Sequence, residues 1–255
     1  MPELPDVEVF REYCRQNILD RKIDRLMIKN SRVMKSSPST LRKHLEGAVF
    51  RQTGRHGKYL FLATDNRELV LHFGMTGRVR FTDKHPEKMD HSPLIIDFED
   101  GTCFVFITVR KLGKVLLIDD RNAFIEKKRL GPDAMDIDRP GFQNAIEKGG
   151  SIKSRLMNQK KIAGIGNVYA DEIFYQTGIL PERKTIDRKE TGRLFNNMQR
   201  ILKVSIRHKA DPGECPERYL INRREQGAKC GICEGRISKK TISGRSSYFC
   251  DRHQK

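Results

Sequence analysis

The chain has 255 residues, of which 37% are hydrophobic and 33% charged, and this hydrophobic share can build one large domain or two modest ones. Lys and Arg outnumber Asp and Glu by 50 to 33, and the resulting charge of +17 points to a polyanionic partner, most simply nucleic acid. No apolar run is long enough to span a bilayer and the first residues lack the pattern of a secretory signal, which argues against membrane-spanning and secreted proteins. We therefore expect an intracellular protein, in the cytoplasm or nucleoid if the source is bacterial.

The positive charge is concentrated in the second part of the chain. Residues 1–150 hold 27 basic and 22 acidic side chains, a net of +5, whereas residues 151–255 hold 23 and 11, a net of +12. Solubility or an anionic membrane surface would also explain an excess of positive charge. No basic helix with a bulky apolar face stands out, so nucleic acid is the favoured partner.

The first residues, Met1-Pro2-Glu3-Leu4-Pro5-Asp6, can carry chemistry. Removal of Met1 would leave Pro2 with a free secondary amine, and a terminal amine titrates near pH 8, so part of it is an uncharged nucleophile at neutral pH. An iminium formed from a secondary amine has no proton to lose and stays positive. Glu3 follows as a possible proton donor or acceptor. The alternative is that Pro2 and Pro5 only stiffen an N-terminal arm.

Apolar spacing divides the chain into a strand-rich part and a helical part. A helix over residues 7–18 is predicted first, followed from about residue 22 to 118 by short strands near residues 59–62, 68–73, 79–81, 94–98 and 104–107. Asp100-Gly101 predicts a hairpin turn, and many short strands without alternating helices favour a β-sandwich or barrel. Gly and Pro near residues 130–133 indicate a linker. Three helical stripes follow, near residues 152–157, 168–174 and 194–206.

A glycine-rich turn, Gly164-Ile165-Gly166-Asn167, precedes one of these helices. Such a turn lets a ligand approach the backbone, and the amides at a helix N-terminus attract anions. Asn167 can cap the helix and donate to a phosphate oxygen. Taken alone, the tetrapeptide favours an ordinary turn between helices.

The six cysteines fall into two groups. Cys14, Cys103 and Cys215 are scattered, and we expect them to be inert, because an intracellular protein does not use a disulfide framework. A second group has the spacing of a tetrahedral structural zinc site with four protein ligands, namely Cys230, Cys233, Cys250 and His253. Between Cys233 and Cys250, alternating apolar and polar residues predict a β-hairpin with Arg245 at its tip. Such a hairpin is suited to binding a nucleic-acid backbone.

Together these features resemble the formamidopyrimidine-DNA glycosylase and endonuclease VIII family of base-excision repair enzymes, and the matches span the chain in the family's order. The matching stretches are Pro2-Glu3-Leu4-Pro5-Asp6-Val7-Glu8, Gly57-Lys58-Tyr59-Leu60, His72-Phe73-Gly74-Met75-Thr76-Gly77, Gly164-Ile165-Gly166-Asn167-Val168-Tyr169-Ala170-Asp171-Glu172, and the Cys-Cys-Cys-His module with Gly244-Arg245. The resemblance implies an α+β multidomain fold. Residues 1–125 would form an N-terminal catalytic β-sandwich with flanking helices, 126–139 a hinge, 140–225 an all-α helix–two-turn–helix domain and 226–255 a zinc-finger hairpin.

The resemblance also implies an activity. The protein would be a monomeric DNA glycosylase and AP lyase that removes oxidised bases from double-stranded DNA, acts on abasic sites and nicks the strand by β,δ-elimination. Pro2 would attack C1′ of the damaged nucleotide, Glu3 would be its acid–base partner and Lys58 would hold a phosphate near the scission site. The implied DNA contacts are the phosphate-binding His72, Asn167 and Arg245, the gap-filling Met75, and Arg110 with Leu112. One structural Zn²⁺ is the only implied cofactor.

Three features depart from the family's pattern. Leu112 stands where most bacterial members have a wedging Phe, and an aliphatic side chain cannot stack like an aromatic ring. His253 replaces the usual last Cys of the zinc site. The segment 208–229 is short beside the family's 8-oxoguanine-binding loop. The resemblance therefore favours formamidopyrimidines and oxidised pyrimidines as substrates at least as much as 8-oxoguanine.

Two other classes of protein remain as alternatives. One is a non-catalytic damaged-DNA-binding protein of the same fold, although Pro2, Glu3 and Lys58 are all present. The other is a tautomerase with a terminal proline, an enzyme class that needs neither zinc nor a charge of +17.

Overall fold

The computed structural model describes residues 1–29, 32–86 and 90–255. It divides into two compact units. Unit 1 contains residues 1–2 and 7–128, and unit 2 contains residues 3–6 and 129–255. None of the helices described is long and apolar enough to cross a membrane.

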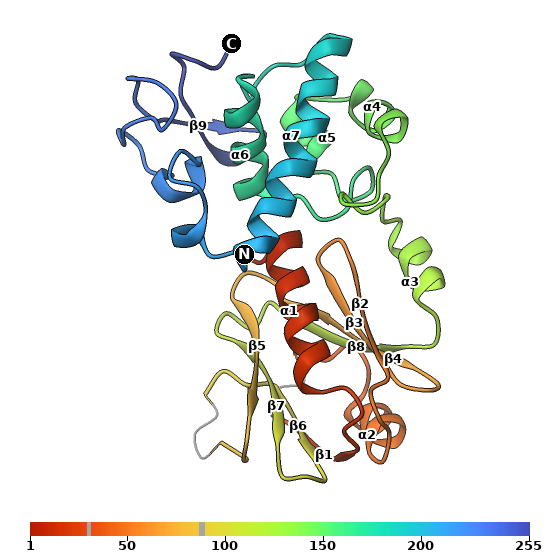
Figure 1. The fold of residues 1–255 in the computed structure, drawn as a ribbon. Coiled ribbons are helices and arrows are strands. Elements are labelled where there is room, and N and C mark those ends of the chain that lie inside the picture. The colour runs from red at the N-terminus through yellow and green to blue at the C-terminus, as the bar shows by residue number, and fades with distance from the viewer. Residues whose placement is uncertain (30–31, 87–89) are drawn as a thin grey trace. The chain divides into compact units, whose positions relative to one another are not determined.

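Unit 1 holds eight strands in its described residues (Figure 1), and they form two four-stranded antiparallel sheets. One sheet has the order β1-β6-β7-β5 and the other β2-β3-β4-β8. The strands are β1 (Ile23–Ile28), β2 (Gln52–His56), β3 (Tyr59–Ala63), β4 (Glu68–His72), β5 (Gly77–Thr82), β6 (Leu94–Phe98), β7 (Cys103–Thr108) and β8 (Lys114–Ile118).

The two sheets enclose one hydrophobic core, which confirms the predicted β-sandwich. Alternate residues of facing strands fill this core, for example Leu60 and Leu62 of β3 and Phe104 and Phe106 of β7. Val7 and Cys14 of the first helix, α1 (Leu4–Asn17), and Ile18 directly after it pack into the same core. The first helix was predicted over nearly the same residues.

Five elements of unit 1, among them β1, were not predicted individually from apolar spacing. Helix α2 (Pro38–Leu45) lies inside the region expected to be strands, and its Ser37 N-cap followed by Pro38 is a recognisable start signal. Strand β2 has a mixed polar sequence and β8 a short apolar one. Helix α3 (Arg121–Lys128) covers the outer face of the second sheet through Phe124, which packs with Phe61 and Val70.

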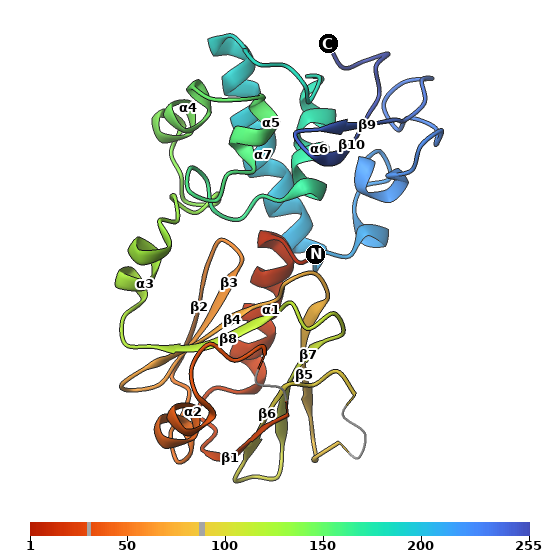
Figure 2. The ribbon, with the colours of Figure 1, turned by 180° about the vertical axis from the view of Figure 1, so that it is seen from behind.

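Unit 2 is helical and ends in a hairpin. Its helices are α4 (Arg139–Glu147), α5 (Ile152–Leu156), α6 (Asn167–Thr177) and α7 (Arg188–Arg207), with short 3-10 turns at Pro212–Glu214 and Leu220–Arg223. Ile173, Phe174, Met198 and Leu202 lie in a core that α6 and α7 share. The hairpin pairs β9 (Ser238–Ile242) with β10 (Arg245–Phe249), and β10 lies beside α6 in Figure 2.

The expected hinge begins inside a helix. α3 ends at Lys128, and the compact units divide between Lys128 and Arg129, inside the expected hinge of residues 126–139. The turn around Gly131 packs against the backbone of Lys161, where a Cβ atom at residue 131 would come within 2.5 Å of a carbonyl carbon. Gly131 is therefore required by a close approach within unit 2.

Helix α7 provides a test of local stability. Asp187 and Glu190 form a reciprocal capping box, with Glu190 N donating to Asp187 Oδ1 at 2.7 Å and Asp187 N donating to Glu190 Oε2 at 2.9 Å. We expect Asp187→Ala to lower the free energy of unfolding by about 1 kcal/mol, because the amides at the helix start lose their acceptor. Urea denaturation measures this, and Asp136→Ala, an exposed aspartate of the same unit, is the control and should change stability little.

Candidate active site and nucleic-acid interface

The carboxylate of Glu3 caps the N-terminus of α6. Its oxygens accept hydrogen bonds from the amides of Gly166 at 2.7 Å, Val168 at 2.9 Å and Tyr169 at 3.3 Å. Gly166, the N-cap residue, has no side chain to do this. The positive end of the helix dipole and three converging amides thus hold an acidic side chain that is 1% exposed. Glu3 is fixed one peptide bond after Pro2.

A close backbone contact holds the residues around Glu3. Leu4 N donates to Gly164 O at 3.1 Å, and Leu4 is buried in the core of unit 2. Gly164 has φ +114°, and a Cβ atom there would lie 2.5 Å from a side-chain carbon of Leu4. Only glycine fits this position, for both reasons.

Asp6 is a second carboxyl group beside Glu3, and no separate role was predicted for it. Its Oδ2 accepts the Glu3 amide at 2.8 Å. Burial, together with the nearby charge of Glu3, raises the pKa of Asp6 to about 6, although the bond from the Glu3 amide opposes the shift. A carboxyl group with such a pKa exchanges protons near neutral pH.

The glycine-rich turn differs from the prediction in one respect. Asn167 is the first residue of α6 and does not cap it, because Glu3 occupies that place. The Asn167 side chain instead donates to the carbonyl of Ser246 in β10 at 2.7 Å. Asn167 therefore joins the helix to the hairpin next to Arg245.

A buried ion pair also joins the hairpin to the helical core. Lys153 Nζ lies 2.5 Å from Asp171 Oδ1 and 2.5 Å from Ser247 Oγ, and all three residues are almost fully buried. Asp171 Oδ2 accepts from Arg224 Nη2 at 2.7 Å and from the Tyr248 amide at 3.2 Å. Asp171 thus has partners on both oxygens, and the network fixes the strand that carries the exposed Arg245.

In unit 1, Lys58 and His72 lie on the β2–β3 turn and at the end of β4. His72 faces Lys114 across the β4–β8 pair, and its ring lies against that of Tyr59, with the ring centres 4.9 Å apart and the planes tilted by 45°. Burial, with the charges of Lys114, Lys58 and Lys128, lowers the pKa of His72 to about 4. His72 is therefore neutral at physiological pH and can donate one hydrogen bond to a phosphate, while the lysines supply the charge.

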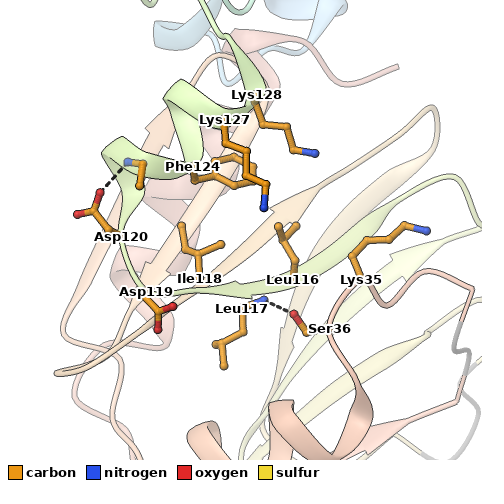
Figure 3. Close-up of a pocket in the computed structure, with 11 residues that line it drawn as sticks. Lys35, Ser36, Leu116, Leu117, Ile118, Asp119, Asp120, Phe124, Lys127 and Lys128 are labelled. Carbon is orange, nitrogen blue, oxygen red and sulfur yellow. Dashed lines mark hydrogen bonds between the residues drawn. The ribbon is translucent and has the colours of Figure 1, made fainter.

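A shallow pocket continues this basic region of unit 1. It has a volume of about 370 Å³, and Figure 3 shows Lys35, Lys127 and Lys128 around an apolar floor that includes Leu116 and Phe124. The acidic residues of its lining have other partners, since Asp119 pairs with Arg67 at 2.6 Å and Asp120 accepts the Ala123 amide at 2.6 Å. The rim therefore has an excess of positive charge.

Two loops of unit 1 present apolar side chains to solvent. Among the described residues, only five large hydrophobic side chains are exposed, and three of them, Met75, Val109 and Leu112, lie in the β4–β5 and β7–β8 loops. Arg110 Nη1 contacts Met75 Sδ at 3.3 Å. A Cβ atom at Gly74, which has φ +60°, would lie 2.5 Å from the Leu112 backbone, so the loops are closely packed.

Cys230, Cys233, Cys250 and His253 converge as predicted, with their ligand atoms all within 4.8 Å of one another. Cys230 Sγ lies 3.5 Å from His253 Nδ1, and Cys233 Sγ lies 3.6 Å from Cys250 Sγ. His253 Nε2 lies 3.1 Å from the Tyr175 carbonyl, an acceptor that orients the ring and leaves Nδ1 for a metal. These residues fit a tetrahedral ion with no open position.

The segment 208–229, expected to be short, is held by a buried carboxyl group. Glu172 of α6 accepts the Ile221 amide at 2.8 Å and the Gln176 side chain at 2.9 Å. Burial raises the pKa of Glu172 to about 7. Neither this contact nor the Lys153–Asp171 pair has a signal in the sequence beyond the match to the family's motif.

The predicted site residues thus form separate groups within each unit. Unit 1 brings Lys58 close to His72 and, separately, Met75 close to Arg110 and Leu112. Unit 2 joins Glu3 to the start of α6, and Asn167 to the strand of Arg245. Sequence reasoning missed Val109, whose exposure depends on the loop geometry.

The pKa of His72 can be tested by NMR. We expect its C2 proton not to titrate between pH 5.5 and 8. Because the folded pKa lies below the ordinary value of 6.5, the contribution of His72 to stability is complete above pH 6.5 and is lost as the pH falls toward 4. Lys114→Ala should raise the pKa of His72, because it removes one of the charges that lower it. Lys43 is not among these charges, so Lys43→Ala should leave the pKa unchanged. A His72 titration near pH 6.5 in the unsubstituted protein would contradict this assignment.

Comparisons with known proteins agree with this architecture. A family model described as the formamidopyrimidine-DNA glycosylase N-terminal domain matches residues 1–115, and one described as the H2TH domain of that enzyme matches residues 130–214. The formamidopyrimidine-DNA glycosylase of Geobacter metallireducens is 31% identical over 271 residues, with both chains fully covered.

Solved structures share the fold over the full length. The Lactococcus lactis Fpg bound to DNA containing N7-benzyl-Fapy-dG is 27% identical, with a TM-score of 0.92 and 100% of both chains covered. The same bacterium's Fpg bound to DNA with an abasic site has a TM-score of 0.91 at 26% identity over 99% of both chains. The resemblance in the sequence is thus confirmed, and the chain belongs to the formamidopyrimidine-DNA glycosylase family of DNA repair enzymes.

Proposed function

We propose that this chain is a bifunctional DNA glycosylase and AP lyase that removes oxidised bases through a Schiff base on Pro2 and nicks the strand by β,δ-elimination. The observation that carries the proposal is the fixed carboxylate of Glu3, held by three amides at the start of α6. A frayed chain end cannot position a nucleophile, whereas this one is bound to a rigid helix. Met1 is 56% exposed and thus accessible for removal.

The chemistry follows from a secondary amine at the chain end. The Pro2 nitrogen attacks C1′ of the damaged nucleotide, the bond to the base breaks and the base leaves with a proton. Glu3 then transfers a proton as the sugar ring opens and the iminium forms. The permanent positive charge of the iminium acidifies C2′, so loss of that proton expels the 3′ phosphate, and a second elimination expels the 5′ phosphate.

The remaining residues would hold the DNA in the reactive geometry. A base inside a duplex hides C1′, so the nucleotide must be everted, at a cost of a few kcal/mol. Contacts of Lys58, His72, Asn167 and Arg245 with phosphates can offset this cost. The exposed side chains of the two loops of unit 1 would fill the gap, with Leu112 as an aliphatic wedge.

The substrate range includes formamidopyrimidines and oxidised pyrimidines, with 8-oxoguanine as a candidate. The segment 208–229 is occupied by two short 3-10 turns that Glu172 fixes to α6. An excision assay on matched duplexes that each carry one of these lesions ranks the substrates. We also propose that the partner is double-stranded DNA with oxidised bases or abasic sites, and that the enzyme acts as a monomer.

Borohydride trapping tests the nucleophile. We expect the untagged protein to be reduced onto DNA containing an abasic site, and an N-terminally extended form to give no adduct because its Pro2 nitrogen is an amide. Pro2→Gly should trap at least tenfold less, and Pro5→Gly serves as the control. An adduct formed equally well by the extended form would refute the role of Pro2. Binding without any adduct would instead support a non-catalytic damaged-DNA-binding protein.

Glu3→Gln separates base release from strand cleavage. Because a positioned proton donor contributes about 10²–10⁴-fold, we expect excision of a damaged base to fall by at least about a hundredfold. Trapping on a preformed abasic site should fall less, since part of that sugar is already the open aldehyde and needs no ring opening by Glu3. Glu12→Gln, the same change in a partly exposed residue of α1, is the control. Single-turnover assays on the two substrates measure both steps.

The Cys-Cys-Cys-His cluster would hold one structural Zn²⁺, which ties the hairpin and Arg245 to unit 2. Removal of the ion by a strong chelator should abolish DNA binding and lower the thermal stability of the protein, because metal binding contributes to folding. The metal content and the melting temperature before and after zinc is restored measure this. If a fully metal-free protein kept its stability and affinity, the structural role would be wrong.

A further inference from the structure

A second group of metal-binding side chains lies in unit 1, on the outer face of the sheet β1-β6-β7-β5. Asp97 of β6 and Cys103 of β7 are directly paired across the two strands, and His85 reaches them from the segment after β5. Their ligand atoms all lie within 4.8 Å of one another. The cluster is formed only by folding, because 11 residues separate His85 from Asp97 and five separate Asp97 from Cys103.

One carboxylate oxygen connects the three side chains. His85 Nδ1 lies 2.8 Å from Asp97 Oδ1, and Cys103 Sγ lies 3.1 Å from the same oxygen. Asp97 and Cys103 are 7% and 1% exposed, so water does not compete freely for their ligand atoms. His85 is exposed and also lines a surface cavity of about 550 Å³ formed by residues 80–86. The cluster is thus closed on the sheet side and open on the His85 side.

The second oxygen of Asp97 has its own partner. Arg25 Nη2 donates to Asp97 Oδ2 at 3.0 Å, which fixes the carboxylate plane and leaves Oδ1 facing Cys103 and His85. Carboxylate ligands of metal ions are commonly oriented by such an outer hydrogen bond. Arg25 lies mostly in solvent, with its side chain 62% exposed, so its positive charge is largely screened at the Oδ1 position.

We propose that His85, Asp97 and Cys103 bind a second divalent metal ion of the zinc class, with water in the fourth position on the His85 side. Imidazole, carboxylate and thiolate are all zinc ligands, and three protein ligands with an open position form a usual tetrahedral set. The ion would be separate from the one held by the Cys-Cys-Cys-His cluster of unit 2. It would fasten the segment after β5 to the two central strands of the sheet.

The two contacts to Asp97 Oδ1 require only small shifts. Metal–ligand bonds of about 2.0–2.3 Å at tetrahedral angles place neighbouring ligand atoms roughly 3.4–3.6 Å apart. The two short contacts to Asp97 Oδ1 would therefore lengthen by about half an ångström. Binding also releases the Cys103 thiol proton to solvent. Because the ion displaces this proton, affinity should increase with pH.

Cobalt provides a direct test in the full-length protein. With Zn²⁺ already bound at the Cys-Cys-Cys-His cluster, added Co²⁺ should bind at one further equivalent per chain, and its spectrum should show one thiolate-to-cobalt charge-transfer band. His85→Gln should weaken this binding at least tenfold, and Cys103→Ala should abolish the band. His91→Gln and Cys14→Ala, which change a histidine and a cysteine outside the cluster, should retain both.

The outcomes distinguish the site from its alternatives. His85 lies at the surface, so His85→Gln can be compared with the unsubstituted protein without loss of a core side chain. Zinc content measured after dialysis should be two per chain for the unsubstituted protein and one for His85→Gln. Saturation at one metal ion, or a cobalt band that persists in Cys103→Ala, would overturn the proposal. A band that persists in this way would come from exchange at the Cys-Cys-Cys-His cluster.

Discussion

The structure depends on one interaction, the capping of helix α6 by a carboxylate from the third residue of the chain. The amides of Gly166, Val168 and Tyr169 need an acceptor, and the helix supplies none of its own. Glu3 satisfies them and is fixed in return. The N-terminus of a helix commonly attracts a phosphate, yet here it binds the side chain that we propose as the acid–base group. The same contact thus stabilises the helix and orients the site.

The two units would contribute different physical properties to the nucleic-acid binding that we propose. In unit 1, lysines surround a histidine that burial keeps neutral, so charge and hydrogen bonding come from different side chains. In unit 2, the exposed Arg245 lies on a hairpin that the Lys153–Asp171 pair and Asn167 bind to the helices. A charged side chain on a fixed strand loses less entropy when it binds a phosphate than one on a mobile loop.

Buried polar groups recur at the points where separate segments meet. Asp171 joins α6 to the hairpin and to the segment of Arg224. Glu172 joins α6 to the segment before the cysteine module. Asp97 joins three elements of the sandwich. Each has its oxygens satisfied, which is the condition under which a buried carboxylate specifies one arrangement. The Asp97 cluster differs because it is open to solvent on one side and holds soft and hard ligands together.

The sequence by itself determined the family, the sandwich, the helical second unit and the cysteine module, because rare motifs, alternation of apolar residues and ligand spacing are local properties of the chain. It also identified Glu3 and Asn167, but not their contacts. Only the tertiary structure showed that Glu3 caps α6, that Asn167 binds the hairpin instead, and that Cys103, expected to be inert, lies beside His85 and Asp97. These relations join residues far apart in the chain, and no local pattern encodes which distant acceptor or ligand a side chain meets.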